Sequence, residues 1–156
     1  MRRKDREVTD RGEIIAIIKE CDVCRLGMTD EEGYAYVVPL NFGLEADDDH
    51  VTLFFHSAKD GHKLDLMKRD PRVSFEMDCG HELVFSEATG QCTMNFKSVM
   101  GRGRISFIDD PEEKLRALRL LTDGYHESHF EFNPKAMPVT AVYKLEVETM
   151  TAKRKG

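Results

Sequence analysis

Hydrophobic and polar residues alternate along much of the chain, which is the period of a β-strand with one buried face. In one such run, Val51, Leu53 and Phe55 are apolar at every second position. Between two of the runs, residues 30–33 form a short turn that contains a glycine, which predicts a hairpin. The strands predicted in this way cover residues 23–29, 34–42, 51–55, 72–77, 93–108 and 139–149.

Two helices are predicted where apolar residues at helical spacing follow an N-terminal capping residue. Asp10 precedes an isoleucine-rich segment, and Glu13 lies three residues further on, as in a capping box. Asp110 precedes a leucine-rich segment in the same way, with proline at the first helical position. Strands linked mostly by hairpins, with about three peripheral helices, predict a mainly β fold, a small antiparallel barrel. We expect one domain over residues 1–156.

The third helix is predicted where a strand ends, and this junction is a candidate anion site. Ser57 and Asp60 have the spacing of a capping box, which predicts a helix from there to about Arg69. The first turn of a helix leaves amides unpaired, and these suit an anion. His62 and Lys63 lie in that turn, where lysine opposes the helix dipole unless a negative group is bound. The pattern indicates either a phosphate site or a solvated surface helix.

Charge and hydropathy narrow the possible partners. The formal net charge of −6 and the pI near 5.5 argue against broad electrostatic binding of nucleic acid. No apolar run approaches a membrane span and no signal peptide opens the chain, so we expect a cytoplasmic protein without membrane contact. Both ends are basic, and we expect the first eight residues to be disordered or arm-like and both termini to be solubilising tails.

The four cysteines do not form a disulfide framework. Cys21 and Cys24 make one C-x-x-C pair, while Cys79 and Cys92 stand apart. The alternatives are a structural zinc site and buried free thiols, and the missing second pair favours thiols. The H-E-S-H sequence at residues 126–129 is one residue shorter than a zinc-protease motif, so no metal site is predicted.

Four short motifs, in this order and spacing, resemble the pyridoxamine 5′-phosphate oxidase-like superfamily. Within that superfamily, the chain is similar to the nitroimidazole resistance (Nim) proteins over nearly its whole length. The resemblance implies a split antiparallel β-barrel that forms a homodimer, with FMN in two equivalent clefts at the interface. The motifs are Val38-Pro39-Leu40-Asn41-Phe42, Phe55-His56-Ser57-Ala58, Gly61-His62-Lys63 and Ser98-Val99-Met100-Gly101-Arg102-Gly103.

The resemblance also implies which residues bind the cofactor. The strand-to-helix junction would hold the FMN phosphate, and the strand interrupted by proline would offer backbone groups to the ring edge. Residues near position 98 would approach the flavin from the neighbouring segment or from the partner subunit. Arg25 would either reach the phosphate or pair with a surface carboxylate. The cofactor-binding residues expected on this basis are Val38, Pro39, Leu40, Asn41, His56, Ser57, Ala58, His62, Lys63, Ser98 and Val99.

His56 is the candidate catalytic residue. One interpretation is a neutral histidine that is hydrogen-bonded at a strand end. The other is a proton donor or substrate anchor beside the flavin, because the charge of histidine changes near neutral pH and nitro-group reduction consumes protons.

The resemblance therefore implies an FMN-dependent oxidoreductase. It would pass electrons from NADH or NADPH to a small acceptor such as a nitroimidazole, with the flavin carrying out the redox chemistry. The alternative is a non-catalytic module on the same barrel that binds a flavin or haem. The residues do not distinguish FMN from FAD or a deazaflavin.

Overall fold

Antiparallel strands dominate the computed structural model, which describes residues 3–125 and 133–156. Three α-helices accompany them, so the predicted mainly β class is confirmed. The strands are β1 (Glu7–Val8), β2 (Cys24–Thr29), β3 (Ala35–Leu40), β4 (Gly43–Ala46), β5 (Val51–Ala58), β6 (Arg72–Ser86), β7 (Gln91–Phe107) and β8 (Thr140–Lys155). The helices are α1 (Arg11–Glu20), α2 (His62–Arg69) and α3 (Pro111–Asp123), with short 3-10 helices at Lys4–Arg6 and Pro134–Val139.

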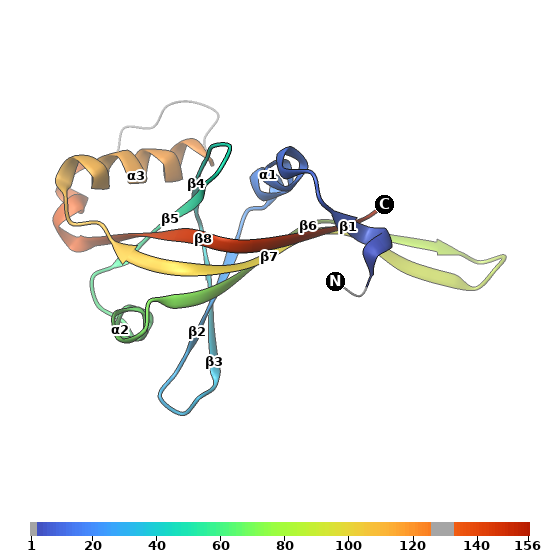
Figure 1. Cartoon of the computed structure of the whole chain (residues 1–156), viewed down its shortest axis with the longest axis horizontal. Coiled ribbons are helices and arrows are strands. Elements are labelled where there is room, and N and C mark those ends of the chain that lie inside the picture. Colours follow the sequence, from blue (N-terminus) through green and yellow to red (C-terminus); the bar gives the residue numbers. More distant parts are fainter. Residues whose placement is uncertain (1–2, 126–132) are drawn as a thin grey trace.

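All the strands belong to one sheet with the order β3-β2-β6-β7-β8-β5-β4, and β1 pairs with β8. The long strands β6, β7 and β8 run through the middle of the molecule, and the β6–β7 hairpin projects beyond it as an arm (Figure 1). Strand β3, which contains Pro39, lies at one edge of the sheet, where a residue without an amide hydrogen is tolerated.

The two predicted capping residues begin α1 and α3. An Asp10 carboxylate oxygen accepts a hydrogen bond from the Glu13 amide at 2.7 Å, and Asp110 accepts from the Glu113 amide at 2.8 Å. Helix α3 packs closely over β4, where a Cβ on Gly43 would lie 2.9 Å from the backbone of α3. Both helices therefore begin as their sequences predict, and a glycine allows α3 to approach the sheet.

Strand β5 is buried on both faces, which fixes the position of the segment that follows it. Leu53 and Phe55 pack into the main core together with Tyr143 of β8. Phe54 faces the other side and packs with Leu118 in a smaller cluster beneath α3. Because side chains on both faces of β5 are packed, the position of the end of the strand is fixed. The predicted anion site begins at this end.

The glycines of β7 lie where the strand backbones approach one another closely. The register of β7 against β8 shifts between Arg102 and Gly103. A Cβ on Gly103 would lie 1.9 Å from the Glu146 carbonyl oxygen, so only glycine fits there. Strands β7 and β8 remain paired on both sides of the bulge, but their register differs between the two sides.

Several boundaries differ from the prediction because strand pairing extends further than the local pattern suggests. Glu7 pairs with Lys153, so both expected tails are ordered strands. Strand β4 was not predicted, and Val139 lies in a 3-10 helix with its side chain exposed. The motif at residues 126–129 lies outside the described residues.

The four cysteines are free thiols. Cys21 and Cys24 are buried, as predicted, but Cys79 is only partly buried and Cys92 is exposed, so the prediction of buried thiols is wrong for Cys92. Within residues 3–125 and 133–156, none of the helices has the length and apolar character that crossing a membrane requires.

Candidate functional site

The strand-to-helix junction differs from the predicted capping box. Strand β5 continues to Ala58, and α2 begins only at His62 with Gly61 as its N-cap. Ser57 pairs with Ala141 of β8 within the sheet, and its hydroxyl donates to the Ala58 carbonyl at 2.9 Å. The prediction of a helix starting at Ser57 is therefore wrong, because sheet pairing outweighs the local capping preference. The predicted helix end at Arg69 is confirmed.

We name residues 57–63 the β5–α2 corner, and this corner is open. Gly61 has φ of 146° and ψ of 149°, a conformation that other residues rarely adopt. A Cβ at this position would meet nothing within 4 Å, and no side chain caps the helix. The amides of the first turn of α2 are therefore left for an external acceptor.

The β2–β3 hairpin fixes the position of His62. The Tyr36 ring meets the His62 ring edge-on, with 5.0 Å between their centroids. His62 Nε2 lies 3.6 Å from a Glu31 carboxylate oxygen, and Arg69 pairs with the same carboxylate at 2.9 Å. His62 therefore packs the corner against the β2–β3 hairpin. Arg69 neutralises the negative charge of Glu31.

Lys63 has a different environment. Its side chain is half-buried in the first turn of α2, and it forms no ion pair or hydrogen bond with the part of the chain that the structure describes. A cation at this end of a helix opposes the helix dipole. An anion bound at the corner would satisfy both Lys63 and the helix amides.

A buried hydroxyl lies at the base of the corner. The Tyr143 side chain is completely buried, stacked 5.8 Å from Phe55, and its hydroxyl has no hydrogen-bond partner among the described residues. Burial raises the pKa of Tyr143 to about 12, and the neighbouring Ser57 hydroxyl is close enough to oppose this shift slightly. An unpaired buried hydroxyl costs free energy, so a polar group bound near Ser57 would satisfy it. These features fit the phosphate group that the resemblance implies.

The second predicted group of residues lies on and just after strand β3. Val38 and Leu40 are half-buried against the core, on the same face as Tyr36, which contacts His62. Pro39 and Asn41 are exposed. Because β3 is an edge strand, one side of its backbone is available to another molecule. The structure therefore places residues 38–41 and the corner on adjoining elements.

His56 lies on the opposite side of the sheet from Ser57. Strand alternation places it with Thr52 and Phe54, on the face that α3 covers further along the strand. The imidazole is accessible to solvent, but partial burial lowers its pKa below the ordinary value of 6.5. His56 is therefore neutral at pH 7 and needs a more acidic solution to carry a proton.

Ser98 and Val99 are far from the corner of the same chain. Ser98 pairs with Lys153 of β8, whereas Ser57 pairs with Ala141 of that same strand. At 3.3 Å per residue, these two positions are about 40 Å apart along β8. The Val99 side chain is fully buried, so it cannot contact a ligand. One chain therefore does not bring residues 98–99 to its own corner.

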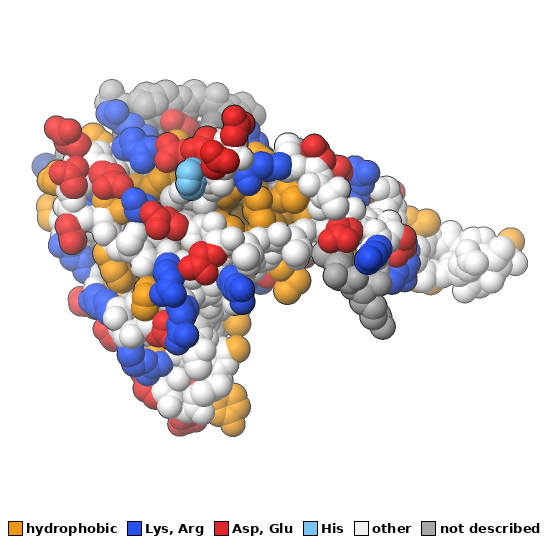
Figure 2. All heavy atoms as spheres, in the orientation of Figure 1, with side chains coloured by type: hydrophobic (Ala, Val, Ile, Leu, Met, Phe, Trp, Pro, Cys, Tyr) orange, Lys and Arg blue, Asp and Glu red, His pale blue; other side chains and the backbone are white. Residues whose placement is uncertain are grey.

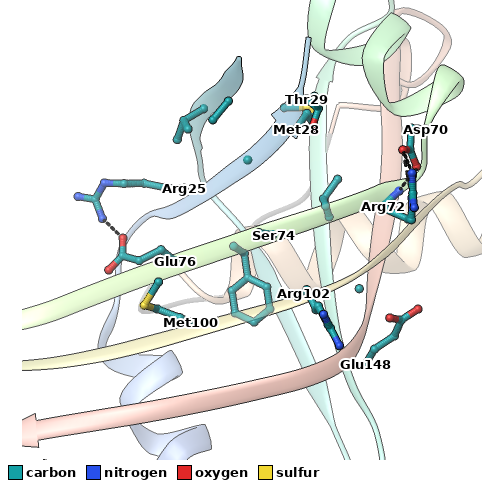
Figure 3. A pocket seen from close by; sticks show the side chains of 16 residues that line it. Arg25, Met28, Thr29, Asp70, Arg72, Ser74, Glu76, Met100, Arg102 and Glu148 are labelled. Atoms are coloured by element: carbon teal, nitrogen blue, oxygen red, sulfur yellow. Dashed lines mark hydrogen bonds and ion pairs between the residues drawn. The ribbon is translucent and has the colours of Figure 1, made fainter. Parts of the chain in front are cut away.

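The outer face of the sheet carries a groove of about 640 Å³ across β2, β3, β6, β7 and β8 (Figure 3). Val37 and Met100 contribute exposed apolar side chains to its lining. Arg25 pairs with Glu76 at 3.0 Å and with Asp78, which confirms the surface-carboxylate interpretation of Arg25. None of the eleven predicted cofactor-binding residues lines this groove.

Comparison with protein families shows to which family the chain belongs. The family model described as pyridoxamine 5′-phosphate oxidase matches residues 10–154. The chain belongs to the pyridoxamine 5′-phosphate oxidase family. This family member is 37% identical to a candidate 5-nitroimidazole antibiotic resistance protein from Bacteroides thetaiotaomicron. The match has a TM-score of 0.83 and covers 94% of this chain and 85% of that one, so the Nim-like relationship is confirmed.

More distant structures share the fold of this pyridoxamine 5′-phosphate oxidase family member. The flavocytochrome Anf3 from Azotobacter vinelandii is 21% identical, with a TM-score of 0.81, and the match covers 100% of this chain and 72% of that one. An FAD- and haem-binding protein from Mycobacterium smegmatis is 15% identical, with a TM-score of 0.82, over 96% of this chain and 73% of that one. The predicted split antiparallel barrel is thus confirmed. No curated protein matches the chain significantly.

Two tyrosines contribute to the site but were not predicted. Tyr36 contacts His62 across two elements, and a contact of this kind has no signature in a single sequence. Tyr143 falls within the strand predicted over residues 139–149, among apolar residues at every second position. Its hydroxyl was the available signal, because a buried tyrosine hydroxyl usually needs a partner.

Proposed function

We propose that the chain is an FMN-dependent oxidoreductase whose β5–α2 corner holds the phosphate of the cofactor. The observation that carries this proposal is Lys63, which lies half-buried beside the uncapped first turn of α2 with no partner in residues 3–125 and 133–156. The phosphate would accept hydrogen bonds from the helix amides and from Lys63, and Ser57 would complete the site. The open surroundings of Gly61 leave room for this group.

The β3 edge would orient the ring of the flavin. Residues 38–41 continue the chain beyond Tyr36, which contacts His62, and the free edge of β3 offers backbone donors and acceptors. When bound, the flavin would supply the hydride and electron chemistry. The protein would bind and orient it and exclude water from one face of its ring.

His56 would deliver a proton to the acceptor. It lies next to Ser57 in sequence but on the other side of the sheet, so it would act at the periphery of the site and not on the phosphate. The lowered pKa makes the imidazolium a stronger acid, though a less populated one at pH 7. Reduction of a nitro group consumes protons, and an accessible histidine can be reprotonated by solvent.

We further propose a homodimer in which the partner subunit supplies Ser98. The distance along β8 rules out the same chain. Met100, two residues further along β7 on the same face, is 56% exposed in the apolar part of the groove. The arm also exposes apolar residues, with Leu83 directly opposite Met94 and Phe85 63% exposed. The visible tip of the arm shows few charged side chains (Figure 2). A second copy would cover these surfaces.

The similarity to a candidate nitroimidazole resistance protein supports a nitroimidazole or another nitroaromatic as the acceptor. The electron donor would be NADH or NADPH, bound transiently over the flavin. We place the reaction in the cytoplasm, where reduced nicotinamides are formed.

Purified protein tests the proposal directly. We expect bound FMN that is released on denaturation, anaerobic bleaching by NADH or NADPH, and recovery of the oxidised spectrum on adding a nitroimidazole. Bound flavin that no nicotinamide reduces would indicate a non-catalytic flavin module. A Soret band after adding haem, without affinity for flavin, would contradict the proposal and favour the haem module.

A further inference from the structure

Two cysteines that are distant in sequence meet where α1 ends against the sheet. Cys21 is the C-cap of α1, and Cys79 lies in β6 directly opposite Lys97 of β7. Lys97 donates to the carboxylate of Glu20, the residue before Cys21, at 2.6 Å. This ion pair holds the two segments together, and Cys79 packs against the core cluster that contains Cys21, so the two side chains are neighbours.

The two thiols differ in accessibility, which gives each a separate role. Cys79 is partly exposed beside an irregularity in the β6–β7 pairing, where Gly80 has φ of 65°. Its strand partner across the β6–β7 ladder is Lys97, and its partial exposure gives a small oxidant access to the sulfur. Cys21 is only 5% exposed, and its thiol donates to the Ile17 carbonyl at 3.2 Å. Cys79 is therefore placed to react first and Cys21 to react second.

We propose that Cys21 and Cys79 form a reversible disulfide when the protein meets hydrogen peroxide. The Cys79 thiolate attacks one peroxide oxygen, the O–O bond breaks, and hydroxide leaves, so sulfur is oxidised to a sulfenic acid as peroxide is reduced. Cys21 sulfur then attacks Cys79 sulfur, and the S–S bond forms as the S–O bond breaks. The departing hydroxide takes the Cys21 proton and leaves as water. A dithiol reductant reverses the oxidation.

The other two thiols are poorly placed for this exchange. Cys24 is completely buried in the core, where an oxidant does not reach it. Burial also raises the pKa of Cys21 far above its usual value, so Cys21 reacts as the second thiol, whose proton the departing hydroxide takes. Cys92 is exposed near the tip of the arm, opposite Phe85 and away from Cys79 along β6. The disulfide would tie the end of α1 to the base of the arm, independently of any flavin.

Peptide mapping of the full-length protein tests the proposal. The protein is treated with hydrogen peroxide, its free thiols are alkylated, and it is cleaved with trypsin, chymotrypsin and an endoproteinase that cuts before aspartate. Asp22 separates Cys21 from Cys24, and Phe85 separates Cys79 from Cys92, so each cysteine lies on its own peptide. We expect one disulfide-linked species that joins the Cys21 and Cys79 peptides and disappears on reduction.

Variants provide the controls. Cys92→Ser should leave the linked species unchanged, whereas Cys21→Ser should abolish it and leave a Cys79 sulfenic acid that dimedone traps. The oxidised wild type should melt about 5 °C above the reduced protein, and Cys79→Ser should show no such shift. Complete alkylation of both Cys21 and Cys79 after oxidation, or a linkage that involves Cys24 or Cys92 instead, would overturn the proposal.

Discussion

The β5–α2 corner and the outer face of β7 both belong to the proposed flavin site, but they depend on different levels of structure. The corner is formed by one short stretch of chain, in which Gly61, His62 and Lys63 follow the end of a strand buried on both faces. Ser98 lies about 40 Å away from it along β8, on a face whose apolar groove nothing in the described chain covers.

This difference shows what each region can do alone. The corner provides the charge and the amides that a phosphate needs without help from a second chain. In the proposed dimer, the outer face would present Ser98 to a neighbouring molecule, so its contribution would depend on assembly. Variants that separate phosphate affinity from assembly therefore test the comparison.

The largest effect should come from a charge on the outer face. Met100→Glu should convert the dimer to a monomer and abolish stoichiometric flavin binding, because a carboxylate would be buried in an apolar interface. Light scattering and the flavin-to-protein absorbance ratio measure both effects. Ala46→Glu, on the exposed edge strand β4, is the matched control and should change neither. A Met100→Glu protein that remains dimeric with full flavin would place the interface elsewhere.

His56 should affect turnover and not cofactor binding. His56→Ala should leave FMN affinity unchanged and slow acceptor reduction by about 100-fold, the scale of a general acid. Because burial lowers the pKa of His56 below 6.5, the wild-type rate should fall as pH rises through a midpoint below 6.5. The variant should lack this limb in stopped-flow measurements, and His50→Ala, in an exposed turn, should retain it. Equal rates and pH profiles for all three proteins would leave His56 a structural residue.

Lys63 tests the corner itself. Lys63→Ala should weaken FMN binding by about 1.5–3 kcal/mol, which is the contribution of a hydrogen bond to a charged group. Isothermal titration of the apoprotein gives the dissociation constant, and the dimer should persist. Lys68→Ala removes the same charge from the last turn of α2 and should have little effect. An unchanged affinity for Lys63→Ala would remove Lys63 from the phosphate site.

The smallest effect should come from Tyr143. Its hydroxyl has no hydrogen-bond partner in the described chain, so Tyr143→Phe should leave the apoprotein as stable as the wild type or stabilise it by up to about 1 kcal/mol. FMN affinity should fall a few-fold if the bound phosphate or an ordered water completes the hydrogen bond. Denaturant melts with and without FMN separate the two effects. A marked loss of apoprotein stability would show that the hydroxyl already has a partner.

The sequence predicted those features whose cause is local. The caps at Asp10 and Asp110 and the hairpin around residues 30–33 depend on neighbouring residues, and all are confirmed. The capping box at Ser57 was wrong because β8 pairs with residues 57 and 58 and extends the strand. Sheet pairing with a distant segment cannot be read from the residues that it overrides.

The candidate site also contains some features that the local sequence predicts and others that depend on distant segments. Lys63 and the corner could be proposed from spacing and charge, whereas the separation of Ser98 from the corner required the register of three strands. The contact of Tyr36 with His62 and the unpaired hydroxyl of Tyr143 also arise only after folding.

Subunit complementation tests the shared site most directly. Lys63→Ala removes the corner charge, and Ser98→Trp blocks the face that the partner subunit would present, so each homodimer should bind little FMN. Differently tagged copies of the two variants are mixed, unfolded and refolded, and the mixed dimer is isolated through both tags. A site built from two chains predicts that the mixed dimer recovers one FMN per dimer, because one corner then has both Lys63 and the partner's Ser98. A mixed dimer that binds no FMN would contradict the shared site, since a site within one chain leaves both copies defective.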